Sequence, residues 1–313
     1  VVEEARGHEP LGYTRRPAGS RIRAGQPERS LRPQWGMDAG IIGLGLIGSS
    51  LGLALRRSGL FDRVVGYDLN ERTGRQALGF GCVDSVVHSI GEAARCGRVF
   101  VAVPPSAVRP CLDAIEAART PETLVSDCVS VKGTVADWVA AKQDRAAWTV
   151  GGHPMAGNEG QGPEAADEEL FRGATWVLVP FGREAPVDEF DRIVRSIGAR
   201  PVVLGADEHD RAVAVTSHLP HILASCLVHT SADLGEAFVS AGSWRDLTRV
   251  AGANPPLWQQ ILVANRRRIL AAMDEMERQL TEVRSALEAN DAEAVRAFLE
   301  EARQLKLRQG GQD

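Results

Sequence analysis

Residues 37–58, MDAGIIGLGLIGSSLGLALRRS, decide the fold class of this chain. A short apolar run leads into the glycine pattern GLGLIG at 43–48, and apolar residues at helical spacing follow it. In such a strand–turn–helix unit, Gly43 permits the tight turn, Gly45 lets a pyrophosphate approach the backbone, and Gly48 lets the helix pack on the strand. The helix N-terminus attracts phosphate groups. The residues expected to hold a dinucleotide here are Gly43, Gly45, Leu46, Ile47 and Gly48.

A carboxylate follows the next apolar stretch. The sequence RVVGYD ends on Asp68, twenty residues after Gly48, where a carboxylate accepts hydrogen bonds from the adenosine ribose. Its charge repels a 2′-phosphate, so the pattern favours NAD over NADP, although Arg72 could reach a phosphate. The alternative role for Asp68 is a plain loop cap.

Strands and helices alternate as far as residue 205. We expect strands at 97–105, 123–130, 146–154, 174–181 and 201–205, with helices at 106–118, 131–142 and 187–197. Such alternation produces a mostly parallel sheet whose ligands bind at the carboxyl ends of the strands. The sequence therefore predicts an α/β fold with a Rossmann-type dinucleotide-binding domain over residues 37–205.

The pattern then becomes helical. Residues 206–231, 244–251 and 256–306 carry apolar residues at helical spacing, which predicts an all-α domain over 206–313. A lone bundle of only ~100 residues buries little surface, so a homodimer that shares helices is favoured. We expect this domain to bind substrate and to dimerise.

The first 36 residues lack apolar periodicity. They contain five Gly, four Pro and seven Arg, which indicates a disordered N-terminal tail. A transit peptide is the alternative, but four Glu in the same stretch count against it.

Charge, apolar runs and cysteines narrow the class of protein. The chain has 36 basic and 41 acidic residues, which argues against a nucleic-acid partner. Residues 39–55 are seventeen uncharged residues, rich in glycine and shorter than the ~20 of a membrane span. No other apolar segment is expected to approach that length, so no membrane partner is expected. Five cysteines without CxxC spacing predict reduced thiols and a cytoplasmic location.

Four polar clusters lie where strands or helices should end. They are DCVSVK at 127–132, GHPMAGNE at 152–159, SHLPH at 217–221 and RDLTR at 245–249. The first two follow strands and therefore lie at the ligand-binding edge of the sheet. Pro220 should kink its helix and expose backbone carbonyls.

These clusters, in this order after GLGLIGSS, resemble the prephenate dehydrogenase family, which includes arogenate and cyclohexadienyl dehydrogenases. The resemblance covers about residues 41–300, including a tryptophan, Trp258, nine residues after Arg249. It implies an NAD-dependent oxidoreductase of tyrosine biosynthesis that converts prephenate to 4-hydroxyphenylpyruvate with loss of CO2. Arogenate or both substrates are the alternative.

The resemblance also assigns roles. His153 is implied as the base for the substrate C4 hydroxyl, with Ser130 holding the hydroxyl or the imidazole, and a neutral imidazole suits that task near pH 7. Arg249 is implied as the carboxylate clamp, because guanidinium pairs with carboxylate through two parallel bonds; a salt bridge to Asp246 is the alternative. The other implied substrate-binding residues are Ser217, His218, His221 and Glu159.

Three other functions compete with this interpretation. His218 and His221 share a helix face and could bind a metal, but no third ligand is in register, so no metal is expected. β-Hydroxyacid dehydrogenases use a catalytic lysine in their helical half, and residues 143–305 contain no lysine. A non-enzymatic nucleotide-sensing protein would not need Ser130, His153 and Arg249 together.

The choice of substrate rests on one group. Arogenate carries an ammonium where prephenate carries a ketone, and the ammonium should require a nearby carboxylate. The expected pocket offers His221 and Arg249 but no carboxylate that can be placed against the substrate side chain, which favours prephenate.

Overall fold

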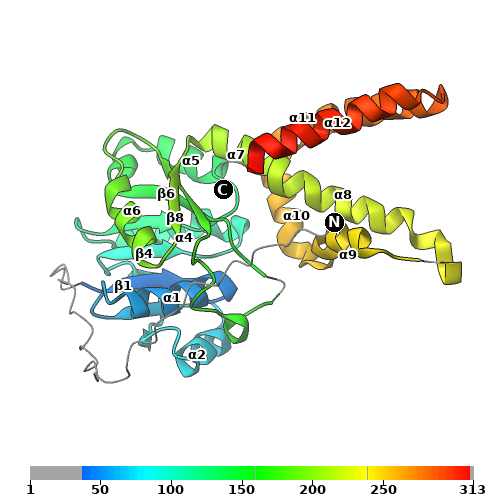
Figure 1. Cartoon of the computed structure of the whole chain (residues 1–313). Helices are drawn as coiled ribbons and strands as arrows, with labels where there is room; N and C mark the ends of the chain where they lie inside the picture. Colours follow the sequence, from blue (N-terminus) through cyan, green and yellow to red (C-terminus); the bar gives the residue numbers. More distant parts are fainter. Residues whose placement is uncertain (1–36, 159, 238, 311–313) are drawn as a thin grey trace, which may run out of the picture. The chain divides into compact units, whose positions relative to one another are not determined.

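One sheet organises the described part of the chain. A computed structural model describes residues 37–158, 160–237 and 239–310, and Figure 1 shows its helices and strands. The strand order is β3-β2-β1-β4-β5-β6-β7-β8. The strands are β1 (Ala39–Ile42), β2 (Val64–Tyr67), β3 (Ser85–Val86), β4 (Arg98–Val101), β5 (Leu124–Asp127), β6 (Thr149–Pro154), β7 (Thr175–Pro180) and β8 (Arg200–Val203). The predicted α/β fold with a mostly parallel sheet is confirmed.

β6 and β7 pair antiparallel, the exception among these strands. The connection between them contains only the 3₁₀ turn η2 (Pro163–Ala165) and no helix that crosses the sheet. A parallel neighbour needs such a crossover to bring the chain back to the starting edge. β7 therefore starts from the edge where β6 ends, and α6 then restores parallel pairing for β8.

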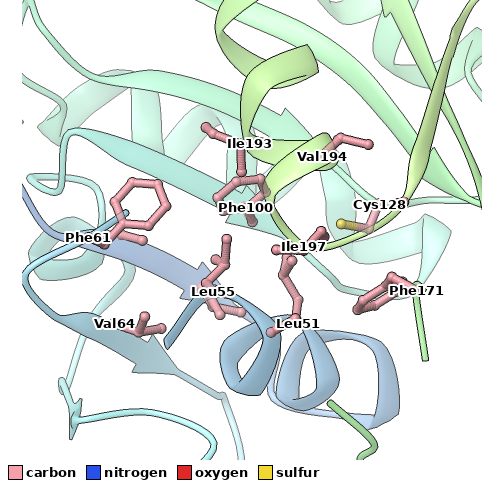
Figure 2. Packing of buried hydrophobic residues seen from close by; sticks show 14 of the residues in the cluster. Leu51, Leu55, Phe61, Val64, Phe100, Cys128, Phe171, Ile193, Val194 and Ile197 are labelled. Carbon is pink, nitrogen blue, oxygen red and sulfur yellow. The ribbon is translucent and has the colours of Figure 1, made fainter. Parts of the chain in front are cut away.

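Helices pack on both faces of the sheet and create two apolar cores. They are α1 (Leu46–Ser58), α2 (Glu71–Gly79), α3 (Ile90–Ala93), α4 (Pro105–Ala118), α5 (Gly133–Ala140) and α6 (Val187–Ser196), with the 3₁₀ turn η1 (Gln143–Ala147) after α5. Phe100 belongs to the core with α1 and α6, where Figure 2 shows it near Leu55 and Ile193. Its neighbours Val99 and Val101 belong to the other core, because side chains alternate across a strand.

The helical region starts soon after the last strand. Its elements are α7 (Ala206–Val213), the π-helical segment η3 (Ala214–His218), α8 (Leu219–Thr230), η4 (Ala232–Ala237), α9 (Gly242–Thr248), η5 (Arg249–Gly252), α10 (Pro255–Ala264), α11 (Arg266–Glu288) and α12 (Ala292–Gly310). The π-helical segment ends two residues before Pro220, which cannot donate a backbone hydrogen bond. The expected kink with exposed carbonyls stays a prediction. The predicted tail falls on residues 1–36, outside the described residues.

The helical stretch expected over 256–306 is not continuous. Asn265 lies between α10 and α11, and residues 289–291 separate α11 from α12. Asn290 adopts a φ of 52° there. Asparagine tolerates this left-handed conformation, which commonly ends a helix.

The helices after α9 leave many apolar side chains exposed. Within the described residues of α10, α11 and α12, the buried apolar side chains are Ile261 and Ile269. Seven leucines on these helices are exposed, namely Leu257, Leu270, Leu280, Leu287, Leu299, Leu305 and Leu307. Exposed apolar side chains in such number are typical of an interaction site when they form one patch.

One helical run, 206–234, is long and apolar enough to cross a membrane by length and composition. The expectation that no apolar segment other than 39–55 approaches that length was therefore wrong, because three helical elements join end to end here. Core helices of globular proteins pass the same test, so this run is weak evidence. The absence of a membrane partner stays a prediction.

Candidate functional site

The glycine turn has the geometry that close backbone packing requires. Gly43 has a φ of 93°, and a Cβ there would lie 2.4 Å from the carbonyl oxygen of Ala102. A Cβ on Gly48 would lie 1.8 Å from the carbonyl oxygen of Gly43. A Cβ on Gly45, in contrast, would meet no atom within 4 Å. Gly43 and Gly48 therefore hold α1 against the turn, while open space lies over Gly45.

This open space lies at the N-terminus of α1. Gly45 is its N-cap, no side chain caps it, and Leu46 and Ile47 form the first turn. Backbone N–H groups at a helix N-terminus have no partner within the helix and bind anions well. The turn therefore fits the pyrophosphate of a dinucleotide.

Asp68 is held beside the same turn. Its Oδ2 accepts a hydrogen bond from the Leu44 backbone N–H at 2.8 Å, and its Oδ1 accepts one from the Asn70 N–H at 2.8 Å. The carboxylate thus both caps a loop and lies within reach of the glycine turn. Its expected contact with a ribose stays a prediction.

A cavity of about 390 Å³ brings together four of the expected site residues. Ser130 and His153 line it from the loop after β5 and from the end of β6, and Ser217 and His218 line it from η3. Trp258 and Ile261 of α10 complete this side of the wall. A larger cavity of about 620 Å³ lies beside Met37 and Arg63, at the amino ends of the strands, and none of the expected site residues lines it.

His153 is buried and takes part in a hydrogen-bonded chain. Its Nδ1 lies 2.8 Å from Nε2 of His209, and Nδ1 of His209 lies 2.8 Å from Oδ1 of Asp210. Burial lowers the pKa of His153 well below its usual value, and the nearby Lys132 lowers it further. His153 is therefore neutral near pH 7 and can accept a proton.

A buried ion pair fixes the backbone next to His153. The Lys132 side chain is fully buried, pairs with Oδ1 of Asp127 and donates a hydrogen bond to the Gly152 carbonyl at 2.5 Å. A Cβ on Gly152 would lie 2.3 Å from the Asp127 carbonyl oxygen. The ends of β5 and β6 are thus held together where His153 projects. Sequence analysis noted Asp127 and Lys132 only as members of a polar cluster.

His218 and His221 pack against Trp258. The His221 ring stacks on the indole with centroids 3.7 Å apart and planes 7° apart, whereas His218 meets it edge-on. Burial lowers the pKa of His221, and it lowers that of His218 to about 4. Nδ1 of His221 is buried without a hydrogen-bond partner among the described residues. A tryptophan that sequence analysis treated as a family match therefore positions both histidines.

Three expected substrate-binding residues are not among the described residues that line this cavity. His221 is buried against Trp258 and is not part of the wall. Arg249 is exposed in η5, and the wall of the 390 Å³ cavity does not include it. Glu159 lies outside the described residues. Their roles stay predictions. The described residues contain no group of three or more His, Cys, Asp or Glu side chains placed to hold a metal ion.

Sequence reasoning missed His209 and Asp210. Asp210 accepts hydrogen bonds from the backbone N–H groups of Lys132 and Gly133 at 2.7 and 2.9 Å, so it caps α5 from α7. Asn265 donates a hydrogen bond to the Asp210 carbonyl and lies 3.1 Å from Nδ1 of His218. The adjacent His-Asp pair at the start of a helix was the available signal.

Comparisons with known proteins identify both halves of the chain. Residues 51–203 match the family model "Prephenate dehydrogenase, nucleotide-binding domain", and residues 205–301 match "Prephenate dehydrogenase, dimerization domain". Prephenate dehydrogenase of Bacillus subtilis is 32% identical over 287 residues, which are 87% of this chain and 76% of that protein.

Two solved structures are also similar. The prephenate dehydrogenase of Aquifex aeolicus in complex with hydroxyphenyl propionate and NAD+ is 25% identical with a TM-score of 0.79, covering 90% of this chain and 99% of that one. Synechocystis arogenate dehydrogenase is 25% identical with a TM-score of 0.75, covering 87% of this chain and 100% of that one.

Proposed function

Because this chain belongs to the prephenate dehydrogenase family, we propose that it catalyses the NAD-dependent oxidative decarboxylation of prephenate to 4-hydroxyphenylpyruvate. The observation that carries the proposal is a buried, neutral His153 beside Ser130 in a cavity at the carboxyl edge of the sheet. A general base has to be neutral at the working pH and within reach of the proton that it removes. His153 satisfies the first condition, and its position in the cavity wall supports the second.

Each residue then has a defined task. His153 accepts the C4 hydroxyl proton, and Ser130 holds that hydroxyl in register. Bound NAD supplies the acceptor for the hydride that leaves C4. Loss of the ring carboxylate as CO2 makes the ring aromatic, so the reaction is effectively irreversible. Arg249 is proposed to bind a substrate carboxylate, together with Ser217, His218, His221 and Glu159 as further substrate-binding residues.

The cofactor proposal rests on the glycine turn and Asp68. The uncapped N-terminus of α1 and the open space over Gly45 suit a pyrophosphate. The carboxylate beside this turn disfavours the 2′-phosphate of NADP. The solved relative that binds NAD+ supports the same choice.

Prephenate is preferred over arogenate because no carboxylate has been placed against the substrate side chain; Glu159 is proposed only to help close the site. The described residues that line the 390 Å³ cavity include no Asp or Glu to pair with an ammonium group. An unpaired ammonium in a closed site would lose hydration without compensation. Arogenate remains the alternative substrate, as the name of the Synechocystis relative illustrates.

A homodimer and a cytoplasmic location complete the proposal. Five of the exposed leucines of α10, α11 and α12 lie in the region that matches the dimerization domain, namely Leu257, Leu270, Leu280, Leu287 and Leu299. All five cysteines are free thiols, which suits a reducing compartment.

The deciding experiment follows the absorbance of reduced nicotinamide with NAD and either prephenate or arogenate. We expect rapid turnover of prephenate and slower turnover of arogenate. Faster turnover of arogenate would reverse the substrate assignment. Binding of NAD without turnover of either substrate would favour the nucleotide-sensing alternative.

A further inference from the structure

His209 and Asp210 lie behind the base and do not line the cavity. They are adjacent on α7, where successive side chains point in different directions. His209 reaches His153 at the end of β6, and Asp210 reaches the N-terminus of α5. One dipeptide therefore connects the catalytic strand to a second helix.

The hydrogen bonds of Asp210 determine which nitrogen of His209 carries the proton. Both Asp210 oxygens accept backbone N–H groups, from Lys132 and Gly133. An ionised carboxylate has no proton to donate, so Nδ1 of His209, 2.8 Å from Oδ1, is the donor in their shared bond. The His209 side chain is fully buried. A neutral imidazole carries a hydrogen on one nitrogen, which here is Nδ1. Its Nε2 is consequently a hydrogen-bond acceptor.

The same logic then applies to His153. Its Nδ1 lies 2.8 Å from the acceptor Nε2 of His209, so this Nδ1 must carry a hydrogen. A neutral imidazole has one protonated nitrogen. Nε2 of His153 is therefore the nitrogen that can accept a proton. Free histidine has no such constraint and can place its proton on either nitrogen.

From this chain of bonds we propose that His209 and Asp210 are positioning residues that hold His153 in the Nδ1-protonated tautomer and present Nε2 as the base. The inference rests on the proposed role of His153. The pair also has a second effect. Once Nε2 of His153 has taken the hydroxyl proton, its Nδ1–H still donates a hydrogen bond to His209, and His209 in turn donates a hydrogen bond to the Asp210 carboxylate. The pair therefore stabilises the charge that forms during the reaction.

Other charged and titratable groups surround this chain of bonds, and the test has to account for them. The loop after β5 contributes Lys132, paired with Asp127 from the strand end. The helical region contributes His218 from η3 and His221 from α8, with the neutral Asn265 between His218 and Asp210. None of these contacts depends on the His209 imidazole, so replacing that ring tests it selectively.

The first test is spectroscopic and does not require activity. In protein labelled with ¹⁵N-histidine, the signals of His153 are identified by their loss in His153→Asn. We expect protonated Nδ1 and unprotonated Nε2 in the wild type, and a mixture of tautomers in His209→Leu. Protonated Nε2 in the wild type would overturn the proposal.

The second test compares kinetics of two substitutions. His209→Leu removes the acceptor, and kcat should fall by about 10–100-fold with KM changed less than about threefold, as for loss of a residue that orients a reacting group. The acidic limb of the profile of kcat against pH should also move to lower pH. The imidazolium of His153 loses its hydrogen-bond acceptor in this variant, which disfavours the protonated form and lowers the pKa of His153. His209→Gln supplies an amide oxygen as acceptor and should recover most of kcat. His229→Leu, at an exposed position on α8, is the matched control and should be unchanged.

These outcomes separate the inference from the proposed function. If His153→Asn is inactive while His209→Leu retains wild-type kcat and tautomer, the positioning role fails and the function stands. If His153→Asn retains activity, the proposed function fails, and the tautomer measurement still tests the hydrogen bond. If kcat falls equally in His209→Leu and His209→Gln while the tautomer of His153 is unchanged, the role of His209 is purely structural. This result would also overturn the proposal.

Discussion

The sheet region and the helical region differ in how they bury apolar side chains. Residues 39–203 contain two apolar cores, one on each face of the sheet. α11, in contrast, has 23 residues and buries one apolar side chain, Ile269. The sheet region therefore closes its own apolar cores, whereas the described helices after α9 leave most of their leucines exposed.

The same contrast applies to the site. Ser130 and His153 come from strand ends that the buried Lys132 ion pair holds in place. Arg249 lies exposed on a short turn of the helical region. We therefore expect the sheet region to control the chemical step and the helical region to control substrate affinity and assembly. Five measurements test this division of roles.

The largest effect is expected for His153→Asn. The substitution keeps a polar side chain of similar size but removes the base, so kcat should fall by ~10²–10⁴ with a smaller change in KM. In the wild type, kcat should rise with pH through one ionisation below the usual histidine value, because burial lowers the pKa of His153. Steady-state kinetics against pH measure both. Ser130→Ala should lower kcat by a smaller factor. A His153→Asn variant with normal kcat and an unchanged acidic limb of the pH profile would remove His153 from the mechanism.

Disrupting the exposed leucines should separate the two chains of the dimer. Leu280 and Leu287 are seven residues apart on α11 and lie on one face. Each leucine buried at an interface contributes about 1.5–3 kcal/mol, so Leu280→Glu with Leu287→Glu should raise the dimer dissociation constant by at least ~10²-fold. Analytical ultracentrifugation measures this. Thr281→Glu adds a charge to the same helix and should remain dimeric; a monomeric wild type would contradict the comparison.

Arg249→Ala should act on affinity. Losing a charged hydrogen-bonding partner of a substrate carboxylate costs about 1.5–3 kcal/mol, so KM should rise by roughly 10–100-fold while kcat changes little. Steady-state kinetics with the preferred substrate test this. A fall in kcat at unchanged KM would assign Arg249 to the chemical step and blur the division between the two regions.

Mild acid should weaken the junction between the regions. Burial lowers the pKa of His153, and lowers that of His218 to about 4. Below pH ~6.5 the unfolded chain binds protons that the folded chain does not. The free energy of unfolding should therefore fall between pH 6.5 and 5, by up to about 1.4 kcal/mol per pH unit for each histidine.

Carboxylates contribute little in this window. Glu116, whose pKa the Arg145 pairing lowers to about 2, stabilises the fold above its unfolded pKa and loses that effect only at lower pH. Urea unfolding at each pH measures how steeply the free energy of unfolding falls with pH. His218→Asn should make this dependence less steep. A slope that is unchanged in this variant would exclude the buried histidine as its cause.

The smallest effect is expected at the cofactor. Asp68→Ser removes the charge that repels a 2′-phosphate, so the preference for NAD over NADP should narrow by about tenfold, or ~1.4 kcal/mol. The ratio of kcat/KM for the two cofactors measures it. Glu71→Gln removes a nearby exposed charge and should leave the ratio unchanged. Equal use of both cofactors by the wild type would show that Asp68 does not discriminate.

Local sequence patterns determined the architecture of this protein. The glycine turn at 43–48, the apolar strand segments and the helical periodicity after residue 205 predicted the elements, because turn geometry and side-chain period depend on residues close in the chain. The order of five short motifs likewise predicted the family, which comparisons confirm. The positions of Ser130 and His153 at one cavity followed from the rule that parallel strands end at the same edge.

Contacts between segments that are far apart in the sequence depend on the tertiary structure. Gly40 stands where a strand usually has an apolar residue, and a Cβ there would lie 2.6 Å from the carbonyl oxygen of Ala93, so the packing of α3 requires a glycine. The antiparallel entry of β7 depended on a connection without a crossover helix. His209 lies 56 residues beyond His153 in sequence but 2.8 Å from it in space. No periodicity or spacing encodes such a pair, because it forms only when α7 packs against the end of β6.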